Sequence, residues 1–278
     1  MTIKTFIMDT SDNKLWFPKA VMGQRPSSSW YYGRAIFVSR HDYRKIFFMF
    51  LAVGIPLGLI ALIFKSKLFW GLAFFTGFLG LLLLFLSLTG LYLQYGPLAK
   101  NYIKKLLTLE SLPANPVVAD IHIGTYRHSY LLSEQIPGSK IVSVDCKQEP
   151  RFSEELAVRE VQMLETPRQS KNITTVYTRD FKIPLQDSSC DAVVFGFGTH
   201  EIPDEEREKI FNEAKRILKT GGKIFLFEHG IDFVNYLIFG PVIYHVTKKE
   251  KWHLLLSEKF IQVKQARLFA VNLFSAGK

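Results

Sequence analysis

Residues 191–229 read DAVVFGFGTHEIPDEEREKIFNEAKRILKTGGKIFLFEH, and this stretch decides the fold. An apolar run at 191–195 comes before a helical pattern at 203–218, and a second apolar run follows at 223–227. The helical pattern has a proline in its first turn, acidic residues where the helix dipole is positive, and two glycines after its end. Two apolar strands joined by such a helix predict a parallel βαβ unit.

Further apolar runs extend this unit in both directions. Three precede it, at residues 117–121, 140–144 and 173–177. Runs at 260–263 and 268–274 predict an antiparallel pair that closes the sheet. Nearly continuous apolar strands that alternate with helices are typical of a parallel sheet covered on both faces. We therefore expect a Rossmann-like α/β domain over residues 116–278, which begins after the breaker cluster Pro-Ala-Asn-Pro.

Two uncharged apolar stretches precede this domain. Residues 46–64 and 68–99 carry no charge, and only Lys-Ser-Lys at 65–67 separates them. Because a membrane helix needs roughly 20 apolar residues, each stretch is long enough to span a bilayer. We expect residues 46–99 to form a transmembrane helical hairpin. The alternative, a buried hairpin in the core of a soluble protein, would be shorter and amphipathic.

Basic residues surround the hairpin and predict its orientation. They are Arg34, Arg40, Arg44 and Lys45 before it, and Lys100, Lys104 and Lys105 after it. The positive-inside rule therefore places both termini in the cytoplasm, with residues 1–45 as a cytoplasmic or interfacial segment and 100–115 as a basic linker. The formal net charge of +10 suits anionic lipid headgroups, so we expect the bilayer and not nucleic acid as a partner. The oligomeric state is left open.

The chain has two cysteines, Cys146 and Cys190. Two cysteines cannot build a metal cluster, and a cytoplasmic domain does not usually form disulfides. We therefore expect no bound metal.

Polar residues follow each predicted parallel strand. In open α/β sheets, ligands bind at the carboxyl ends of the strands, so these residues are candidates for a site. They are Asp120 to Tyr126, Asp145, Asp180, Gly196 to Glu201, and Glu228 with His229.

The order of these elements resembles the class I S-adenosylmethionine-dependent methyltransferases, most closely the group that includes quinone and phospholipid methyltransferases. The residues that carry the resemblance are VVADIHIGT, IVSVDC, RDFKIPLQDSSCDAVVFGFGTHEIP and REKIFNEAKRILKTGGKIFLFEHG. It covers residues 117–228. It implies a mostly parallel sheet with an antiparallel C-terminal strand, and S-adenosyl-L-methionine as the cofactor.

The resemblance also implies a role for several residues. Gly124 would let the backbone approach the methionine part of the cofactor. Asp120 would lie near the cofactor ammonium group, and Asp145 would accept from the ribose hydroxyls. Asp180 would accept from the adenine amino group, with Phe181 beside the ring. His122 and Gly196 complete the cofactor set.

The first turn departs from the family pattern of three glycines. His122 and Tyr126 occupy the first and third glycine places, and only Gly124 remains. We expect both larger side chains to turn away from the methionine part of the cofactor. Loss of cofactor binding is the alternative that this departure raises.

Methyl transfer needs a base only if the acceptor must lose a proton. His200 and Glu201 follow the fourth strand and face the transfer site in this fold. An unperturbed histidine, with a pKa near ~6.5, suits a general base. His229 and Glu228, after the fifth strand, are second candidates.

We therefore expect a membrane-anchored methyltransferase with a lipophilic acceptor. A quinone or phenol precursor and a phospholipid amine both remain open, and the apolar stretch at 232–246 could form a lipid-facing entrance. The alternative is a catalytically inactive membrane scaffold or assembly factor that keeps the fold.

Overall fold

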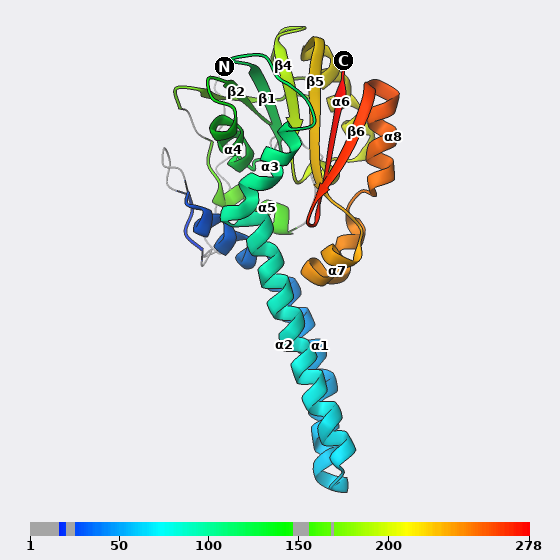
Figure 1. Cartoon of the computed structure of the whole chain (residues 1–278). Coiled ribbons are helices and arrows are strands. Elements are labelled where there is room, and N and C mark those ends of the chain that lie inside the picture. The colour runs from blue at the N-terminus through cyan, green and yellow to red at the C-terminus, as the bar shows by residue number, and fades with distance from the viewer. Residues whose placement is uncertain (1–16, 21–25, 147–155, 168–169) are drawn as a thin grey trace.

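A computed structural model describes residues 17–20, 26–146, 156–167 and 170–278 of the chain. A helical hairpin projects from one end of an α/β domain (Figure 1). Much of residues 1–45 lies outside the described residues, so the predicted interfacial segment is described only in part.

The domain is built on a seven-stranded sheet with the order β3-β2-β1-β4-β5-β7-β6. Its strands are β1 (Val117–His122), β2 (Lys140–Asp145), β3 (Ile173–Tyr177), β4 (Cys190–Phe195), β5 (Leu218–His229), β6 (Ile261–Leu268) and β7 (Val271–Gly277). The first five strands run parallel, and β7 pairs antiparallel with both β5 and β6. The predicted fold class is confirmed, because strands that are buried on both faces read as continuous apolar runs.

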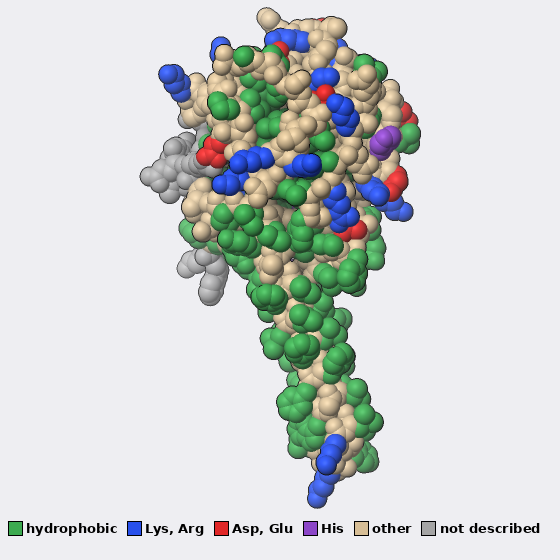
Figure 2. All heavy atoms as spheres, viewed as in Figure 1, with side chains coloured by type: hydrophobic (Ala, Val, Ile, Leu, Met, Phe, Trp, Pro, Cys, Tyr) green, Lys and Arg blue, Asp and Glu red, His purple; other side chains and the backbone are tan. Residues whose placement is uncertain are grey.

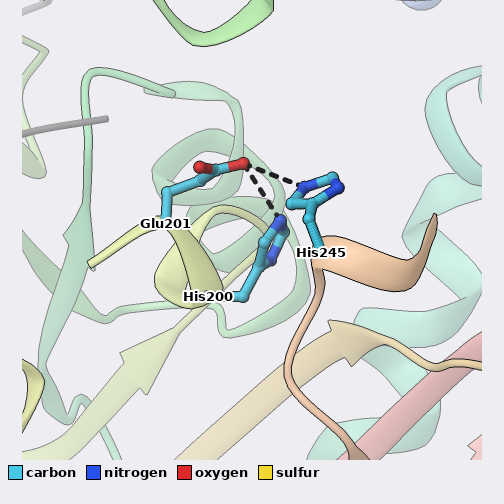
Figure 3. Close-up of side chains that lie close together, drawn as sticks. All are labelled: His200, Glu201 and His245. Atoms are coloured by element: carbon cyan, nitrogen blue, oxygen red, sulfur yellow. Dashed lines mark hydrogen bonds and ion pairs between the residues drawn. The ribbon is translucent and has the colours of Figure 1, made fainter. Parts of the chain in front are cut away.

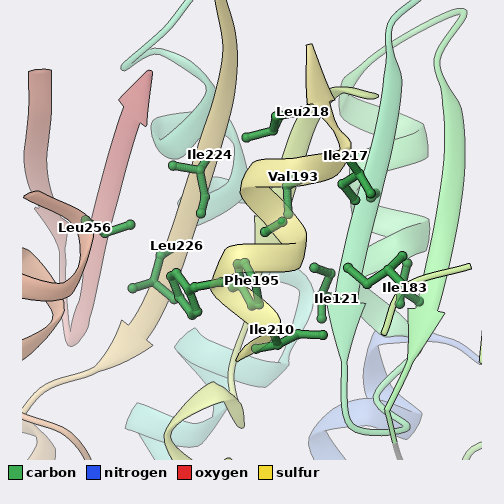
Figure 4. Close-up of a cluster of buried hydrophobic side chains, with 14 of the residues drawn as sticks. Ile121, Ile183, Val193, Phe195, Ile210, Ile217, Leu218, Ile224, Leu226 and Leu256 are labelled. Atoms are coloured by element: carbon green, nitrogen blue, oxygen red, sulfur yellow. The ribbon is translucent and has the colours of Figure 1, made fainter. Parts of the chain in front are cut away.

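Helices cover both faces of the sheet. The domain helices are α3 (Lys100–Leu107), α4 (Arg127–Gln135), α5 (Leu156–Leu164), α6 (Asp204–Ile217) and α8 (Lys249–Lys259). On one face, Val193 and Phe195 of β4 belong to one core cluster with Ile210 of α6 and Leu256 of α8 (Figure 4). On the other face, α3 and α4 bury Leu106 and similar residues against the same strands.

The hairpin consists of α1 (Ser28–Phe64) and α2 (Lys67–Tyr95). The helix α1 begins well before residue 46, because Ser27 caps it by accepting from the Trp30 amide. The first half of α1 contains polar and charged residues, so its sequence shows no apolar pattern. This half of the helix packs on α5 of the domain. There Arg40 forms a two-fold hydrogen-bonded ion pair with the buried Glu160.

Two stretches of the hairpin are long and apolar enough to cross a membrane, Tyr43–Phe64 and Lys67–Tyr95. In the most apolar 18-residue window of each stretch only 6% of the residues are buried inside the protein, which distinguishes both from the core helices of a soluble domain. Figure 2 shows this surface as almost continuously hydrophobic, with basic side chains at the far end. Such an exposed apolar surface requires a partner other than water.

Residues 100–115 are not a simple linker. Three residues of α3 are fully or almost fully buried in the domain core, Tyr102, Ile103 and Leu106. The short helix η1 (Pro97–Ala99) joins α3 directly to α2. The strong alternation of basic and apolar residues in α3 therefore reflects a helix that packs on the sheet with one face. This packing fixes the hairpin to the domain.

A second link between hairpin and domain comes from α7 (Phe233–Phe239) and the 3-10 helix η3 (Gly240–His245), which follow β5. Gly90 of α2 lets Ile238 approach, since a Cβ at that position would lie 2.2 Å from Ile238 Cγ1. The Ser87 hydroxyl donates to the Ile238 carbonyl, and Gln94 donates to Asn235 at 3.4 Å. The apolar stretch at 232–246 therefore packs on the hairpin as well as on the sheet.

Candidate active site

A cavity of about 190 Å³ lies at the carboxyl ends of the strands, where the hairpin meets the domain. The turn after β1 lines it with Ile123 and Thr125, the end of β4 with Phe197 and Gly198, and the end of β5 with His229. The hairpin closes the opposite side with Arg34, Leu91 and Tyr95. The cavity therefore occupies the position at which sheets of this kind bind ligands.

Several buried polar atoms at this cavity have no hydrogen-bond partner among the described residues. They are Thr125 Oγ1, His128 Nδ1 and His229 Nδ1. Buried polar groups in native proteins are nearly always paired, so these atoms indicate a place for a ligand or water. Burial and the charge of Arg127 lower the pKa of His128, so its ring is neutral.

The turn between β1 and α4 is held by the side chain that replaces its first glycine. Gly124 has a φ of 91°, a conformation that glycine adopts at little cost. Its amide donates to His122 Nδ1 at 3.1 Å, and His122 Nε2 lies 2.7 Å from Ser143 Oγ of β2. His122 is buried beneath the turn and does not line the cavity. Although it was predicted to bind the cofactor, its side chain supports the turn.

Asp145, the predicted ribose acceptor, is fully buried at the end of β2. The Tyr126 hydroxyl donates to Asp145 Oδ2. Burial and the neighbouring Asp145 charge raise the pKa of Tyr126, which keeps the hydroxyl protonated. Tyr126 thus turns away from the cavity, but it reaches the carboxylate that a ribose would need.

Asp120 lies inside the sheet, four residues before Gly124. Ser129 donates to Asp120 Oδ2 at 2.6 Å, while Oδ1 has no hydrogen-bond partner in the part of the chain that the structure describes. Burial raises the pKa of this carboxyl to about 7. A cationic or hydrogen-bond-donating ligand nearby would stabilise its charged form.

None of the predicted cofactor residues lines the cavity: Asp120, Gly124 and Asp145 lie beside it, and three others lie apart from its wall. Asp180 and Phe181 both adopt positive φ in a tight turn, where Asp180 is exposed and Phe181 is buried in the core. Gly196 is a packing residue, since a Cβ there would come within 2.4 Å of His128 Nδ1. The glycine that lines the cavity is Gly198, with a φ of 101°.

His200 and Glu201 lie on the cavity wall in the short helix η2 (Thr199–Glu201), close to His245 of η3 (Figure 3). His200 Nδ1 lies 2.9 Å from Glu228 Oε2, and His200 Nε2 lies 3.3 Å from Glu201 Oε1. Burial alone would lower the pKa of His200, but the charges of Glu228 and Glu201 outweigh it and raise the pKa to about 10. His200 is therefore not the unperturbed base that its sequence position suggests.

His229 has the opposite environment. Burial, together with the charges of His200 and His245, lowers its pKa well below the usual value, so the ring is neutral. It stacks on Phe197 with ring centroids 4.1 Å apart, and its Nε2 lies 3.0 Å from the Tyr95 hydroxyl. Its Nδ1 has no partner among the described residues. A neutral imidazole with an unpaired nitrogen at a cavity wall can accept a hydrogen bond from a ligand.

Sequence reasoning missed the cavity residues that come from distant segments. Arg34 and Tyr95 belong to the hairpin, and His245 belongs to the apolar stretch at 232–246. Burial lowers the pKa of Arg34 to about 10, and Glu165 of the domain forms an ion pair with it. The buried charge at Arg34 carried no local signal, because it lies in a mixed polar and aromatic segment.

Comparisons with known proteins agree with this geometry. Residues 120–226 match the family model of the methyltransferase domain. A demethylmenaquinone methyltransferase from Bacillus cereus is 25% identical over 130 residues, which are 46% of this chain and 51% of the relative. Another from Geobacillus sp. is 27% identical over 110 residues, which are 39% and 43% of the two chains. The present chain spans about half the length of the curated relatives that it matches.

Among solved structures, a SAM dependent methyltransferase from Aquifex aeolicus aligns with a TM-score of 0.47 and 19% identity, over 63% of this chain and 88% of that chain. Residues 120–226, which run from β1 to β5 along the carboxyl-end cavity, thus match a methyltransferase domain.

Proposed function

We propose that this chain is a membrane-anchored methyltransferase that methylates a lipophilic acceptor with a quinol or phenol ring. One observation carries the proposal. The cavity at the carboxyl ends of the strands shares Phe239 and Val242 with a second, larger and apolar groove between α1, α2 and α7. An acceptor with an apolar tail could thus place its ring in the cavity and its tail in the groove.

The groove has a volume of about 690 Å³. Apolar residues of both candidate membrane spans line it, together with the glycines Gly54, Gly77 and Gly80, which leave room between the helices. On the proposed topology it lies at the level of the bilayer. A groove of this kind suits an isoprenoid or acyl chain far better than a freely diffusing polar substrate.

We assign the S-adenosylmethionine site to residues at the strand ends, which lie beside the cavity and not on its wall. The unpaired Asp120 Oδ1 suits the neighbourhood of its ammonium group, the positive φ of Gly124 suits close approach of the backbone, and Asp145 suits the ribose. The cofactor, when bound, supplies an electrophilic methyl group. Tyr126 must share or release Asp145 for the ribose to bind there.

We assign His229 as the residue that takes up the proton that the acceptor loses. If His229 Nε2–H donates to the Tyr95 oxygen, the Nδ1 lone pair is left at the cavity wall to take that proton. On the same wall, His200 forms ion pairs with Glu201 through Nε2 and with Glu228 through Nδ1. We assign His200 and Glu201 to orienting the polar ring of the acceptor and not to removing its proton.

The acceptor class follows from the relatives and from the groove. The relatives are named demethylmenaquinone methyltransferases, and such an acceptor has the polar ring and apolar tail that the two cavities suit. A phospholipid amine is the competing acceptor. On the topology that the basic residues predict, the domain faces the cytoplasm and takes the acceptor from the inner leaflet.

The test is methyl transfer by the full chain in lipid nanodiscs with labelled S-adenosylmethionine. Reduced demethylmenaquinone, its ring without the tail, and phosphatidylethanolamine serve as acceptors. We expect label in the first, much less in the second, and none in the third. Transfer to phosphatidylethanolamine alone, or equal transfer to the ring with and without its tail, would contradict the proposed acceptor.

Matched glycine variants test the groove. Gly77 lines the groove and Gly71, on the same helix, does not; a Cβ at either position meets nothing within 4 Å. Gly77→Phe should raise KM for the long-tailed acceptor and leave the tailless ring unaffected, whereas Gly71→Phe should change neither. Equal effects of both variants would show that the groove does not hold the tail.

A scaffold without cofactor is the second candidate, and the Tyr126–Asp145 hydrogen bond favours it because it occupies the carboxylate that the ribose needs. The two functions differ in cofactor binding, which calorimetry with S-adenosylhomocysteine measures directly.

A further inference from the structure

We infer that His200, Glu201 and His245 form a binding site for a divalent transition-metal cation. Each residue offers one ligand atom, and the three atoms all lie within 4.8 Å of one another. His200 Nε2 and His245 Nε2 both face Glu201 Oε1 (Figure 3). Two imidazole nitrogens and one carboxylate oxygen are ligands that Zn²⁺ and its neighbours prefer. The expectation of no metal considered only cysteines, and this donor set contains none.

The outer nitrogens of both rings are already engaged. His200 Nδ1 faces Glu228 Oε2 at 2.9 Å, and His245 Nδ1 faces the carbonyl oxygen of Val242. Both of these oxygens only accept hydrogen bonds, so both Nδ1 atoms carry the proton. A neutral ring then has its lone pair on Nε2, which is the atom turned toward Glu201. Metal-binding histidines are commonly fixed by such an acceptor on the other nitrogen.

The distances also favour a cation between the three atoms. His200 Nε2 and His245 Nε2 lie 3.3 Å and 3.2 Å from Glu201 Oε1. A charge-assisted hydrogen bond between nitrogen and oxygen is about 2.7–2.9 Å long. Ligands about 2.1 Å from a tetrahedral metal lie about 3.4 Å apart, so the observed separations match the edges of a coordination shell. The third edge, between the two histidines, is at most 4.8 Å long, and His245, whose side chain is 33% exposed, would have to approach His200 when a cation binds.

The site opens onto the cavity, because all three residues line its wall. Three protein ligands leave a tetrahedral cation one position for water or for an oxygen of a bound molecule. The inference does not depend on the proposed function, since metal binding can be measured without cofactor or acceptor.

The test is a titration of the chelator-treated, tag-free full chain in detergent with Co²⁺, followed by its visible absorption bands and by calorimetry. We expect one Co²⁺ per chain, displaced by Zn²⁺. His245→Ala should weaken binding by at least about 100-fold, and Glu228→Gln by about 10- to 100-fold through the Nδ1 partner of His200.

His253→Ala is the matched control, because His253 is an exposed histidine on α8 outside the cavity. It should bind Co²⁺ as the unaltered chain does. Far-ultraviolet circular dichroism establishes that each variant is folded. Absence of stoichiometric binding by the folded unaltered chain, or equal binding by His245→Ala, would overturn the inference and leave a cluster held by protons.

Discussion

Replacing Tyr126 by phenylalanine should strengthen cofactor binding while it destabilises the protein. In the structure, the Tyr126 hydroxyl donates to Asp145, and both side chains are buried. If the ribose hydroxyls use the same carboxylate, the cofactor must compete with Tyr126 for it. Tyr126→Phe removes the competitor without changing the shape of the ring.

The size of the effect follows from this hydrogen bond. A hydrogen bond to a charged group contributes about 1.5–3 kcal/mol. Without the hydroxyl, the free protein loses that amount and Asp145 is left without this donor. The cofactor restores one, so affinity for S-adenosylhomocysteine should rise by up to about 10- to 150-fold, since each 1.4 kcal/mol is tenfold.

Isothermal titration calorimetry gives the affinity, and denaturant unfolding in detergent gives the loss of stability. Tyr244→Phe is the matched control, because Tyr244 is 64% exposed. Asp145→Ala should weaken binding by about 1.5–3 kcal/mol, and in that background Tyr126→Phe should have little further effect on affinity. Weaker binding by Tyr126→Phe alone would show that Tyr126 is part of the cofactor site and does not compete with the ribose.

Four further predictions follow from other parts of the molecule. A reporter inserted at residue 66 should lie outside the cytoplasm and one at the C-terminus inside it; the reverse arrangement would contradict the topology. Gly124→Val should abolish cofactor binding measured by calorimetry, because a β-branched residue disfavours the φ of 91°, and retained affinity would argue against the turn as the binding element. Burial raises the pKa of Asp120 from 3.8 to about 7, so the folded protein holds its proton longer than the unfolded chain. The free energy of unfolding of the cofactor-free protein should therefore fall as the pH rises from about 4 to about 7, and Asp120→Asn should remove that slope in denaturant titrations. Gly90→Ala should lower stability by about 1–3 kcal/mol, because its Cβ would overlap Ile238, whereas Gly71→Ala, which meets no atom within 4 Å, should cause no loss.

The spacing of the apolar runs, together with the polar residues that follow each of them, was enough to predict the sheet. The apolar runs became β1 to β5 with boundaries shifted by a few residues. The strand β5 begins earlier than predicted, at Leu218, which pairs with Cys190 of β4, and its pairing with β7 begins at Lys223. Apolar length also predicted the hairpin, since an uncharged stretch of that length is uncommon in a soluble domain.

The first half of α1 and the packing of α3 could not be read in this way. Their charged residues suggested solvent, but Arg40 finds Glu160, 120 residues away, and α3 buries one face in the core. Contacts between segments distant in the chain leave no periodic signal in either segment.

The site shows the same division. Residues at strand ends such as Asp145 and His229 were identified because the parallel sheet itself brings strand ends together. The pKa values of His200 and His229 depend on neighbours from other segments. Relative to an ordinary histidine, the pKa of His200 is raised and that of His229 is lowered. Tyr126 could not be assigned to Asp145 from sequence, because a tyrosine in a glycine position gives no indication of where its hydroxyl points.

Calorimetric titration of the unaltered full chain with S-adenosylhomocysteine tests the central claim most directly. We expect saturable binding of one molecule per chain, lost in Gly124→Val. Absence of binding at millimolar ligand by folded protein would contradict it, and the scaffold function would take its place.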